Sequence, residues 1–258
     1  MVPTLVHADW QGPVARITLD SPQNRNALSE ELLQQLTREV TRARDEAQIR
    51  VLVLAHEGKA FCSGADLRQQ TSALAQGARP EGVGGLVPLL RLLQDCPKPI
   101  VAAVGGPARA GGVGLVAACD IAVASEAASF ATGEVRIGLA PAVLSVVALP
   151  RLGPTAAADL FLTGRVVGAQ EALRMGLVAR AVPEDQLAAE VQEVVSALLL
   201  AHPNALAACK RILARVPRLE REAAFTEMAQ LSRSLFGTAE AEEGMSAFLE
   251  RRPPNWVA

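Results

Sequence analysis

The chain has 258 residues, of which 50% are hydrophobic, so it is long enough to bury a sizeable core as one large domain. Lysine and arginine number 25 against 27 aspartate and glutamate residues, and the net charge of −2 gives no overall attraction to nucleic acid or to an anionic membrane. Aromatic residues make up only 3% of the chain, with no tyrosine, which leaves few stacking surfaces for single-stranded nucleic acid.

The first part of the chain alternates apolar strands with amphipathic helices. The strands are apolar or β-branched runs between turn residues, and the first long helix starts at Ser29, a good N-cap. This alternation predicts sheets covered by helices over residues 1–190. Strands are expected at residues 4–10, 14–19, 51–55 and 100–104, and helices at 29–47, 85–94 and 111–119, with a helix starting near residue 65 and a loose loop at 71–85.

The second part of the chain becomes wholly helical. A helix at residues 168–178 is ended by Gly176 and leads into a short strand at 178–182. The sequence therefore predicts an α/β core over residues 1–190 and a helical region over 191–258 that caps the core or mediates self-association. The remaining helices are expected at residues 142–152, 155–162, 187–198, 205–214, 219–235 and 239–251.

Four cysteines are scattered without C-x-x-C spacing, and three of them lie in apolar stretches typical of buried free thiols. His7, His56 and His202 lie far apart in the sequence, so we expect no metal site and ordinary surface or turn histidines. We expect no signal sequence at the start of the chain, and no apolar run reaches the roughly 18 residues of a membrane span. We expect a cytoplasmic protein that binds neither membrane nor nucleic acid.

Residues 98–134 hold the main candidate for chemistry. An apolar strand is followed by a loop, and Gly111 and Gly112 then open a short apolar helix. The N–H groups at a helix start have no intrahelical partner and lie at the positive end of the helix dipole, so they can stabilise a negative oxygen on a ligand. Glu134 is an isolated carboxylate between apolar stretches, where a general acid or base can act.

The run GVGLVA at residues 112–117 also matches the dinucleotide-binding fingerprint, with Glu134 about 20 residues further on. In that fold the first glycine directly follows the first strand, whereas here a loop separates the strand from Gly112. We therefore do not expect a nicotinamide cofactor. The basic residues of 210–221 alternate with acidic and apolar positions, which is typical of a solvated or subunit-facing helix surface.

Five segments carry a family resemblance, and they occur in the same order over nearly the whole chain. They are GKAFCSGADL (58–67), KPIVAAVGG with AGGVGLVAACDIAVAS (98–125), FATGEVRIGLAP (130–141), TGRVVGAQEALRMGLV (163–178) and AFLERRPPNW (247–256). Together they resemble the crotonase family, the enoyl-CoA hydratase/isomerase superfamily. The resemblance implies a spiral of ββα units, a C-terminal helical region that forms trimers or dimers of trimers, and an active site for acyl-CoA thioesters. Because coenzyme A is part of the substrate, no separate cofactor is expected.

By this resemblance, the backbone N–H groups of Ala65 and Gly111 form an oxyanion hole. Moving a proton at the carbon next to a thioester creates an enolate, whose negative oxygen needs preorganised donors. Family hydratases use two glutamates, of which the second aligns with Glu134 and the first with Gly114. No Asp or Glu occurs at residues 108–118, so the two-glutamate mechanism does not transfer unchanged.

Three hypotheses follow. In the first, the chain is an enoyl-CoA hydratase in which Glu134 alone activates the water, and backbone groups near Gly114 and Ala142 position that water. In the second, it is an isomerase that moves a double bond from the 3 to the 2 position with one base. In the third, Glu134 is structural and the chain only binds acyl-CoA. A working Glu134 is expected to have a raised pKa, because burial disfavours its charge.

The resemblance also implies a binding site for the coenzyme A part of the substrate. Arg25 is expected near the phosphates, and Arg251 or Arg252 is expected to reach the ligand of a neighbouring subunit. Residues Ala60, Asp66 and Leu67 are expected around the adenine and pantetheine. The acyl pocket is expected to be lined by residues 69–85 together with Val143 and Leu144.

Overall fold

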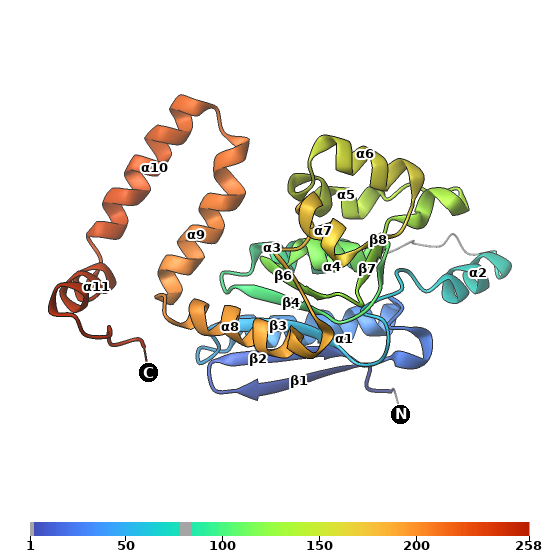
Figure 1. Cartoon of the computed structure of the whole chain (residues 1–258), viewed down its shortest axis with the longest axis horizontal. Helices are drawn as coiled ribbons and strands as arrows, with labels where there is room; N and C mark the ends of the chain where they lie inside the picture. Colours follow the sequence, from blue (N-terminus) through green and yellow to red (C-terminus); the bar gives the residue numbers. More distant parts are fainter. Residues whose placement is uncertain (1–2, 78–83, 258) are drawn as a thin grey trace.

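The structure is a computed structural model that describes residues 3–77 and 84–257. Within these residues a six-stranded sheet has the order β1-β2-β3-β4-β6-β9, and a three-stranded sheet has the order β5-β7-β8 (Figure 1). β1 pairs antiparallel with β2, and the other neighbours in the large sheet pair parallel. The strands are β1 (Val6–Gln11), β2 (Val14–Leu19), β3 (Val51–His56), β4 (Ile100–Val104), β5 (Ala108–Arg109), β6 (Ile121–Ser125), β7 (Ser129–Ala131), β8 (Val167–Gly168) and β9 (Arg180–Val182).

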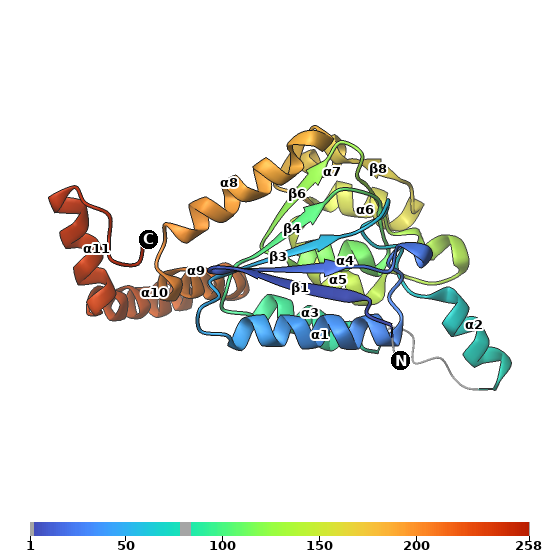
Figure 2. The same ribbon diagram turned by 90° about the horizontal axis from the view of Figure 1, so that it is seen from below.

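Helices cover both faces of the large sheet. Figure 2 shows α1 and α3 on one side of the sheet and α8 on the other. The α-helices are α1 (Glu30–Asp45), α2 (Leu67–Ala75), α3 (Leu86–Asp95), α4 (Gly111–Ala118), α5 (Ala142–Ala148), α6 (Pro154–Thr163), α7 (Ala169–Met175), α8 (Leu187–Leu199), α9 (Pro203–Arg215), α10 (Arg221–Phe236) and α11 (Ala239–Glu250). Short 3₁₀ turns are η1 (Pro22–Asn24), η2 (Gly133–Ile137), η3 (Leu149–Arg151), η4 (Glu184–Gln186) and η5 (Val216–Arg218).

The strand β3 shows why the central strands are apolar throughout. Leu52 and Leu54 point into the main core against α1 and α3, whereas Val51 and Val53 belong to a second cluster under α8. Successive side chains in a strand point to opposite faces, and both faces of this strand are buried. Two consecutive strands followed by a helix recur along the chain, as in β4-β5-α4, where β4 lies in the large sheet and β5 in the small one. This arrangement confirms the expected α/β fold of ββα units.

Helices α9, α10 and α11 form an arm that extends away from the sheet (Figures 1 and 2). α9 is tied to the core by Lys210, whose Nζ lies 2.6 Å from Asp120 Oδ2 and donates to Lys98 O at 3.1 Å. Arg50 holds the other end, because its guanidinium donates to the carbonyls of Leu199, Ala201 and Trp256. The proposed boundary at residue 190 falls within α8, which packs on the sheet, and the division into two parts stays a prediction.

Most expected elements are confirmed to within a few residues, and three expectations are wrong. Residues 71–75 are helical and belong to α2, since the local Ala and Gln residues favour a helix; residues 78–83 of the expected loop lie outside the described residues. The helix expected at 142–152 ends at Ala148 and continues as η3, because Pro150 lacks the N–H that a helix needs. His56 is not an ordinary surface or turn residue.

Instead, His56 is partly buried at the end of β3, and its Nε2 accepts a hydrogen bond from Gly105 N at 3.0 Å. Burial lowers its pKa, because the charged form is poorly solvated there. The ring packs edge-on against Phe61, with ring centroids 5.6 Å apart. As expected, Cys62, Cys96 and Cys119 are buried and free, while Cys209 is exposed. Among the described residues, no helix is long and apolar enough to span a membrane, and no group of three or more candidate ligands could hold a metal ion.

Candidate active site

The turn that contains Ala65 is held between two neighbouring segments of chain. On one side Leu28 N donates to Gly64 O at 2.8 Å and Asp66 N donates to Leu28 O at 3.4 Å, which leaves Ala65 between them. On the other side Arg109 N donates to Cys62 O at 2.9 Å. In a parallel bridge of this kind, the central residue directs its own N–H away from the neighbour. Within residues 3–77 and 84–257, the Ala65 N–H has no hydrogen-bond acceptor.

Gly111 supplies the second predicted donor as the first residue of α4. Its N–H also has no acceptor in the described part of the chain, as expected at a helix start. The preceding residue, Ala110, has φ 48° and ψ −119°, a backbone conformation that residues other than glycine rarely adopt. Its carbonyl accepts hydrogen bonds from Val113 N at 2.9 Å and Gly114 N at 3.3 Å. This sharp turn therefore starts α4 and directs the Gly111 N–H out of the helix.

Glycines bring these two donor turns into contact. A Cβ atom on Gly64 would lie 2.9 Å from Ala110 Cβ, and one on Gly112 would lie 2.7 Å from Cys62 O. Neither position can carry a side chain without moving its neighbour, and Gly64 also has a positive φ of 89°. The structure thus places the predicted donors, Ala65 and Gly111, on turns that touch each other.

Glu134 lies on η2, which follows the small sheet. Ala110 N donates to Ala131 O at 2.9 Å, and Arg109 pairs with Ala131 between β5 and β7. The strand pairing therefore links the Glu134 turn directly to the start of α4. The Glu134 side chain is partly buried, and its Oε2 is buried without a hydrogen-bond partner among the described residues.

Burial also affects the charge of Glu134. Desolvation raises the pKa of the Glu134 carboxyl above its usual range, and the residue's own backbone N–H opposes this shift. The expected direction of the shift is confirmed. A half-buried carboxylate with an unpaired oxygen and a raised pKa is suited to accept and return a proton.

Gly114 lies in an apolar contact between helices. It is fully buried in α4, and a Cβ atom there would lie 3.1 Å from Leu144 Cβ and 3.8 Å from Leu90 Cδ1. Leu144 belongs to α5 and Leu90 to α3, and both are buried. The absence of a side chain at position 114 therefore allows α5 to pack closely against α4. Leu144 of α5 fills the space into which a carboxylate at position 114 would project.

The residues predicted to bind coenzyme A lie at the edge of these turns. Arg25 is exposed, and its carbonyl accepts a hydrogen bond from Ser63 N at 3.0 Å. Ala60 is buried, and its carbonyl accepts from Asn26 Nδ2 at 2.8 Å. The Asp66 carboxylate accepts from Arg68 N and Gln69 N at the start of α2. The Arg25 and Ala60 carbonyls and the Asp66 carboxylate therefore already accept hydrogen bonds within the protein. The roles of these residues in binding coenzyme A stay predictions.

Further along the chain, Leu67 is 51% exposed and remains accessible to a ligand. Ala142 N donates to Ala140 O at 2.7 Å, and Gly114 N donates to Ala110 O at 3.3 Å, so neither N–H is free to position a water. Arg252 is paired with Glu243 and Glu250, at 2.7 Å in each case, and its role toward a neighbouring ligand stays a prediction. Arg251 is exposed at the end of α11.

Two polar residues that hold the site together were missed by sequence reasoning. Asn26 is fully buried with a positive φ of 53°; its Oδ1 accepts from Ser21 N at 2.7 Å, and its Nδ2 donates to Glu57 O at 3.0 Å. Thr132 is also fully buried, two positions before Glu134. The available signal was weak: each is a polar residue beside apolar ones, close to a segment already singled out.

Comparison with known proteins shows the family of the chain. A family profile described as Enoyl-CoA hydratase/isomerase matches residues 9–258. The chain belongs to this family. Enoyl-CoA hydratase EchA19 of Mycobacterium tuberculosis is 34% identical over 249 residues, which cover 95% of this chain and 94% of that protein. Carnitinyl-CoA dehydratase of Salmonella typhi is 34% identical over 260 residues, which cover 97% of each.

Solved structures of the enoyl-CoA hydratase/isomerase family confirm the fold. The enoyl-CoA hydratase of Mycobacterium smegmatis aligns with a TM-score of 0.92 at 32% identity, covering 99% of this chain and 100% of that one. Enzymes of this family act on acyl-CoA substrates, so the class of enzyme and of substrate predicted from the sequence is confirmed at that level.

Proposed function

We propose that the protein is an enoyl-CoA hydratase-type enzyme that works through a stabilised enolate. One observation carries the proposal: two adjoining turns present the unpaired N–H groups of Ala65 and Gly111, and β5–β7 pairing ties the partly buried Glu134 to the same place. The N–H groups bind the thioester oxygen and stabilise its developing negative charge. Ala65, Gly111 and Glu134 are the residues that act on the reacting atoms.

In the hydratase reaction, Glu134 removes a proton from water while the water oxygen bonds to C3 of a 2-enoyl-CoA. The electrons of the double bond move toward the thioester oxygen and form the enolate. Protonated Glu134 then returns the proton to C2, which restores the carboxylate and the thioester. The proton and the hydroxyl group come from one water molecule, and no electrons are gained or lost overall, so the proposed reaction needs no redox cofactor.

A second candidate is the one-base isomerase, and the packing at Gly114 favours it. Glu134 would remove a proton from C2 of a 3-enoyl-CoA and return it to C4, with the same enolate held by the same donors. This reaction needs neither a second carboxylate nor a positioned water. Leu144 fills the space into which a side chain at position 114 would project. The N–H groups of Gly114 and Ala142 already have hydrogen-bond acceptors.

The test is a panel of 2-enoyl-CoA and 3-enoyl-CoA thioesters incubated in ¹⁸O water and read by mass spectrometry. Labelled 3-hydroxyacyl product supports the hydratase, and unlabelled conversion of 3-enoyl to 2-enoyl thioester supports the isomerase. Glu134→Gln keeps the shape but removes the proton carrier, and we expect turnover to fall by about 10²-fold or more while acyl-CoA binding remains. Glu126→Gln is the control, because Glu126 is exposed on the surface.

Either of two results would count against an enolate mechanism based on Glu134. Unchanged turnover of Glu134→Gln would remove this residue from the reaction. Binding of acyl-CoA without turnover of any thioester would instead support a non-catalytic acyl-CoA binding protein.

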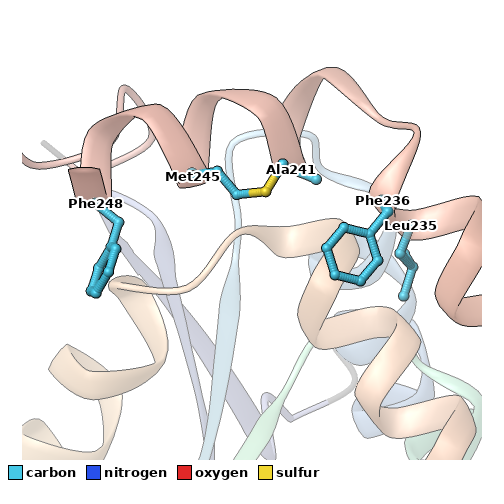
Figure 3. A pocket seen from close by; sticks show the side chains of 6 residues that line it. Leu235, Phe236, Ala241, Met245 and Phe248 are labelled. Carbon is cyan, nitrogen blue, oxygen red and sulfur yellow. The ribbon is translucent and has the colours of Figure 1, made fainter. Parts of the chain in front are cut away.

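We further propose that the protein forms a homotrimer or a dimer of trimers in the cytoplasm. The arm supports self-association, because Phe236, Phe248 and Leu249 are 70%, 82% and 80% exposed. Phe236, Met245 and Phe248 line a hollow between α10 and α11 (Figure 3). Its volume is about 380 Å³. This hollow is lined by apolar residues and lies on the arm, away from Glu134. Light scattering of the purified protein tests the assembly, and cell fractionation tests the location.

A further inference from the structure

The turn that carries Glu134 is braced by α6 as well as by the small sheet. Thr132 Oγ1 donates to Leu160 O at 2.9 Å, and the Thr132 side chain is fully buried. Further along the same turn, Arg136 Nε donates to Thr163 O at 3.3 Å. Both acceptors are carbonyls in the last turn of α6, so this helix end holds the segment on both sides of Glu134.

The end of α6 approaches this turn unusually closely. Gly164 follows α6 with a positive φ of 58°, and a Cβ atom on it would lie 3.3 Å from Gly133 Cα and 3.1 Å from Val135 Cγ2. The next residue, Arg165, is paired with both Asp159 and Glu171, which fixes the corner between α6 and α7. The brace therefore rests on a corner that two ion pairs also hold.

On its other side the same segment is bonded to the start of α4, through Ala110 N and Ala131 O at 2.9 Å. Thr132 thus lies between the residue tied to the donor turns and the residue that carries the carboxylate. We propose that Thr132 is a positioning residue for Glu134. The Thr132 hydroxyl keeps the Glu134 carboxylate at a fixed place relative to the N–H groups of Ala65 and Gly111. This inference rests on the proposed function, because it assumes that Glu134 moves the proton.

Thr132→Val offers a clean test of the hydroxyl. Valine has nearly the shape of threonine, and Leu160 O keeps a partner without the hydroxyl, because it also accepts from Gly164 N at 3.1 Å. No buried acceptor is left unsatisfied, so the substitution should not unfold the site. Thr132→Ser restores a hydroxyl at the same position. Thr226→Val is the matched control, since its hydroxyl donates to Glu222 O, also at 2.9 Å, on the exposed face of α10.

We expect Thr132→Val to lower kcat by about ten-fold with KM changed less than about two-fold, because small displacements of a reacting group reduce rate more than binding. Thr132→Ser should recover most of the rate, and Thr226→Val should match the wild type. Without the hydroxyl to hold the turn, the Glu134 carboxylate should also be able to shift toward solvent, which lowers its raised pKa. The acid limb of kcat/KM should then move to lower pH.

Neighbouring charges complicate such a pH shift only slightly. Charged groups on the surrounding elements include Arg109 on β5, Arg136 on the turn itself, the cluster of Arg165, Asp159 and Glu171, and Arg174 on α7. Arg109 donates to Ser129 O at 2.7 Å, and Arg136 donates to Thr163 O. None of these groups loses its partner in Thr132→Val, so a shift reports the surroundings of Glu134.

A second readout does not depend on turnover. Carbodiimides react with protonated carboxyl groups, so the pH dependence of Glu134 labelling, followed by peptide mass spectrometry, reports its titration directly. We expect the labelling of Thr132→Val to require lower pH than that of the wild type. The inference is overturned if Thr132→Val matches Thr226→Val in both kcat and labelling, or if kcat falls only together with Tm and serine does not restore it.

The two proposals fail in different measurements. Full activity of Glu134→Gln would contradict the proposed function, whatever the activity of Thr132→Val. An inactive Glu134→Gln together with an unaffected Thr132→Val would sink the positioning role alone. If the wild type turns over no thioester, the labelling profile still decides whether Thr132 controls the surroundings of Glu134.

Discussion

Glu134 is a carboxylic acid whose partial burial disfavours its charged form. Burial raises its pKa, and its Oε2 has no hydrogen-bond partner within the described residues. Because the folded-state pKa lies above the unfolded value, the protonated form favours folding. This contribution is complete below the unfolded pKa and is lost as the pH rises through the folded pKa. At neutral pH the charged group therefore reduces stability, as expected where a residue is kept for function.

We predict that Glu134→Gln raises Tm at about pH 8, where the wild type carries the buried charge, and leaves it nearly unchanged at about pH 4, where Glu134 is already largely protonated. Calorimetry at both pH values measures the difference. Glu126→Gln should show no such dependence, because that side chain is exposed. An equal Tm difference for Glu134→Gln at both pH values would mean that the carboxylate is solvated.

At the scale of elements, the contact between α4 and α5 depends on Gly114. We predict that Gly114→Ala lowers the free energy of unfolding, although alanine favours a helix by about 1 kcal/mol. The new Cβ would lie 3.1 Å from Leu144 Cβ, which is tighter than an ordinary contact, so α5 must shift outward. Overpacking of this kind costs about 1–3 kcal/mol, which leaves a net loss of up to about 2 kcal/mol.

Chemical denaturation of wild type and Gly114→Ala measures this loss. Gly153→Ala is the control, because no atom lies within 4 Å of its added Cβ and its φ is −62°. We expect the control to change stability by less than about 0.5 kcal/mol. If Gly114→Ala is instead more stable than the wild type, helix propensity outweighs the contact, and α5 has room to accept a side chain at 114.

At the scale of the whole molecule, the arm of α9–α11 exposes apolar side chains that the core does not cover. We predict that Phe248→Glu weakens self-association by at least about 2 kcal/mol and leaves the circular dichroism spectrum of the fold unchanged, since Phe248 is 82% exposed in the single chain. Sedimentation at several concentrations measures the association.

Gln192→Glu adds the same charge on the exposed face of α8 and should keep the assembly of the wild type. A Phe248→Glu variant that assembles as well as the wild type would place the contact elsewhere. In that case the hollow between α10 and α11 would not face another copy.

The sequence alone predicted the features that depend on local pattern. The apolar runs of β3 and β4 mark strands buried on both faces, and Gly111 marks the start of α4, because these signals come from neighbouring residues. The family and the fold also followed from motifs in a fixed order, and comparison confirms them. The raised pKa of Glu134 was expected from its apolar neighbours in sequence. The helical character of residues 71–75 is local as well, and was missed because glycine and proline nearby suggested a loop.

Only the tertiary structure decided the contacts that make these segments one site. The Thr132 hydroxyl meets Leu160 O at a separation of 28 positions, and Asn26 reaches Ala60 O across 34. Leu144 packs on Gly114, and His56 accepts a hydrogen bond from Gly105, although neither sequence segment indicates its partner. Such contacts arise when packed elements bring distant residues together. Which buried polar group meets which acceptor is therefore set by the folded arrangement rather than by local sequence.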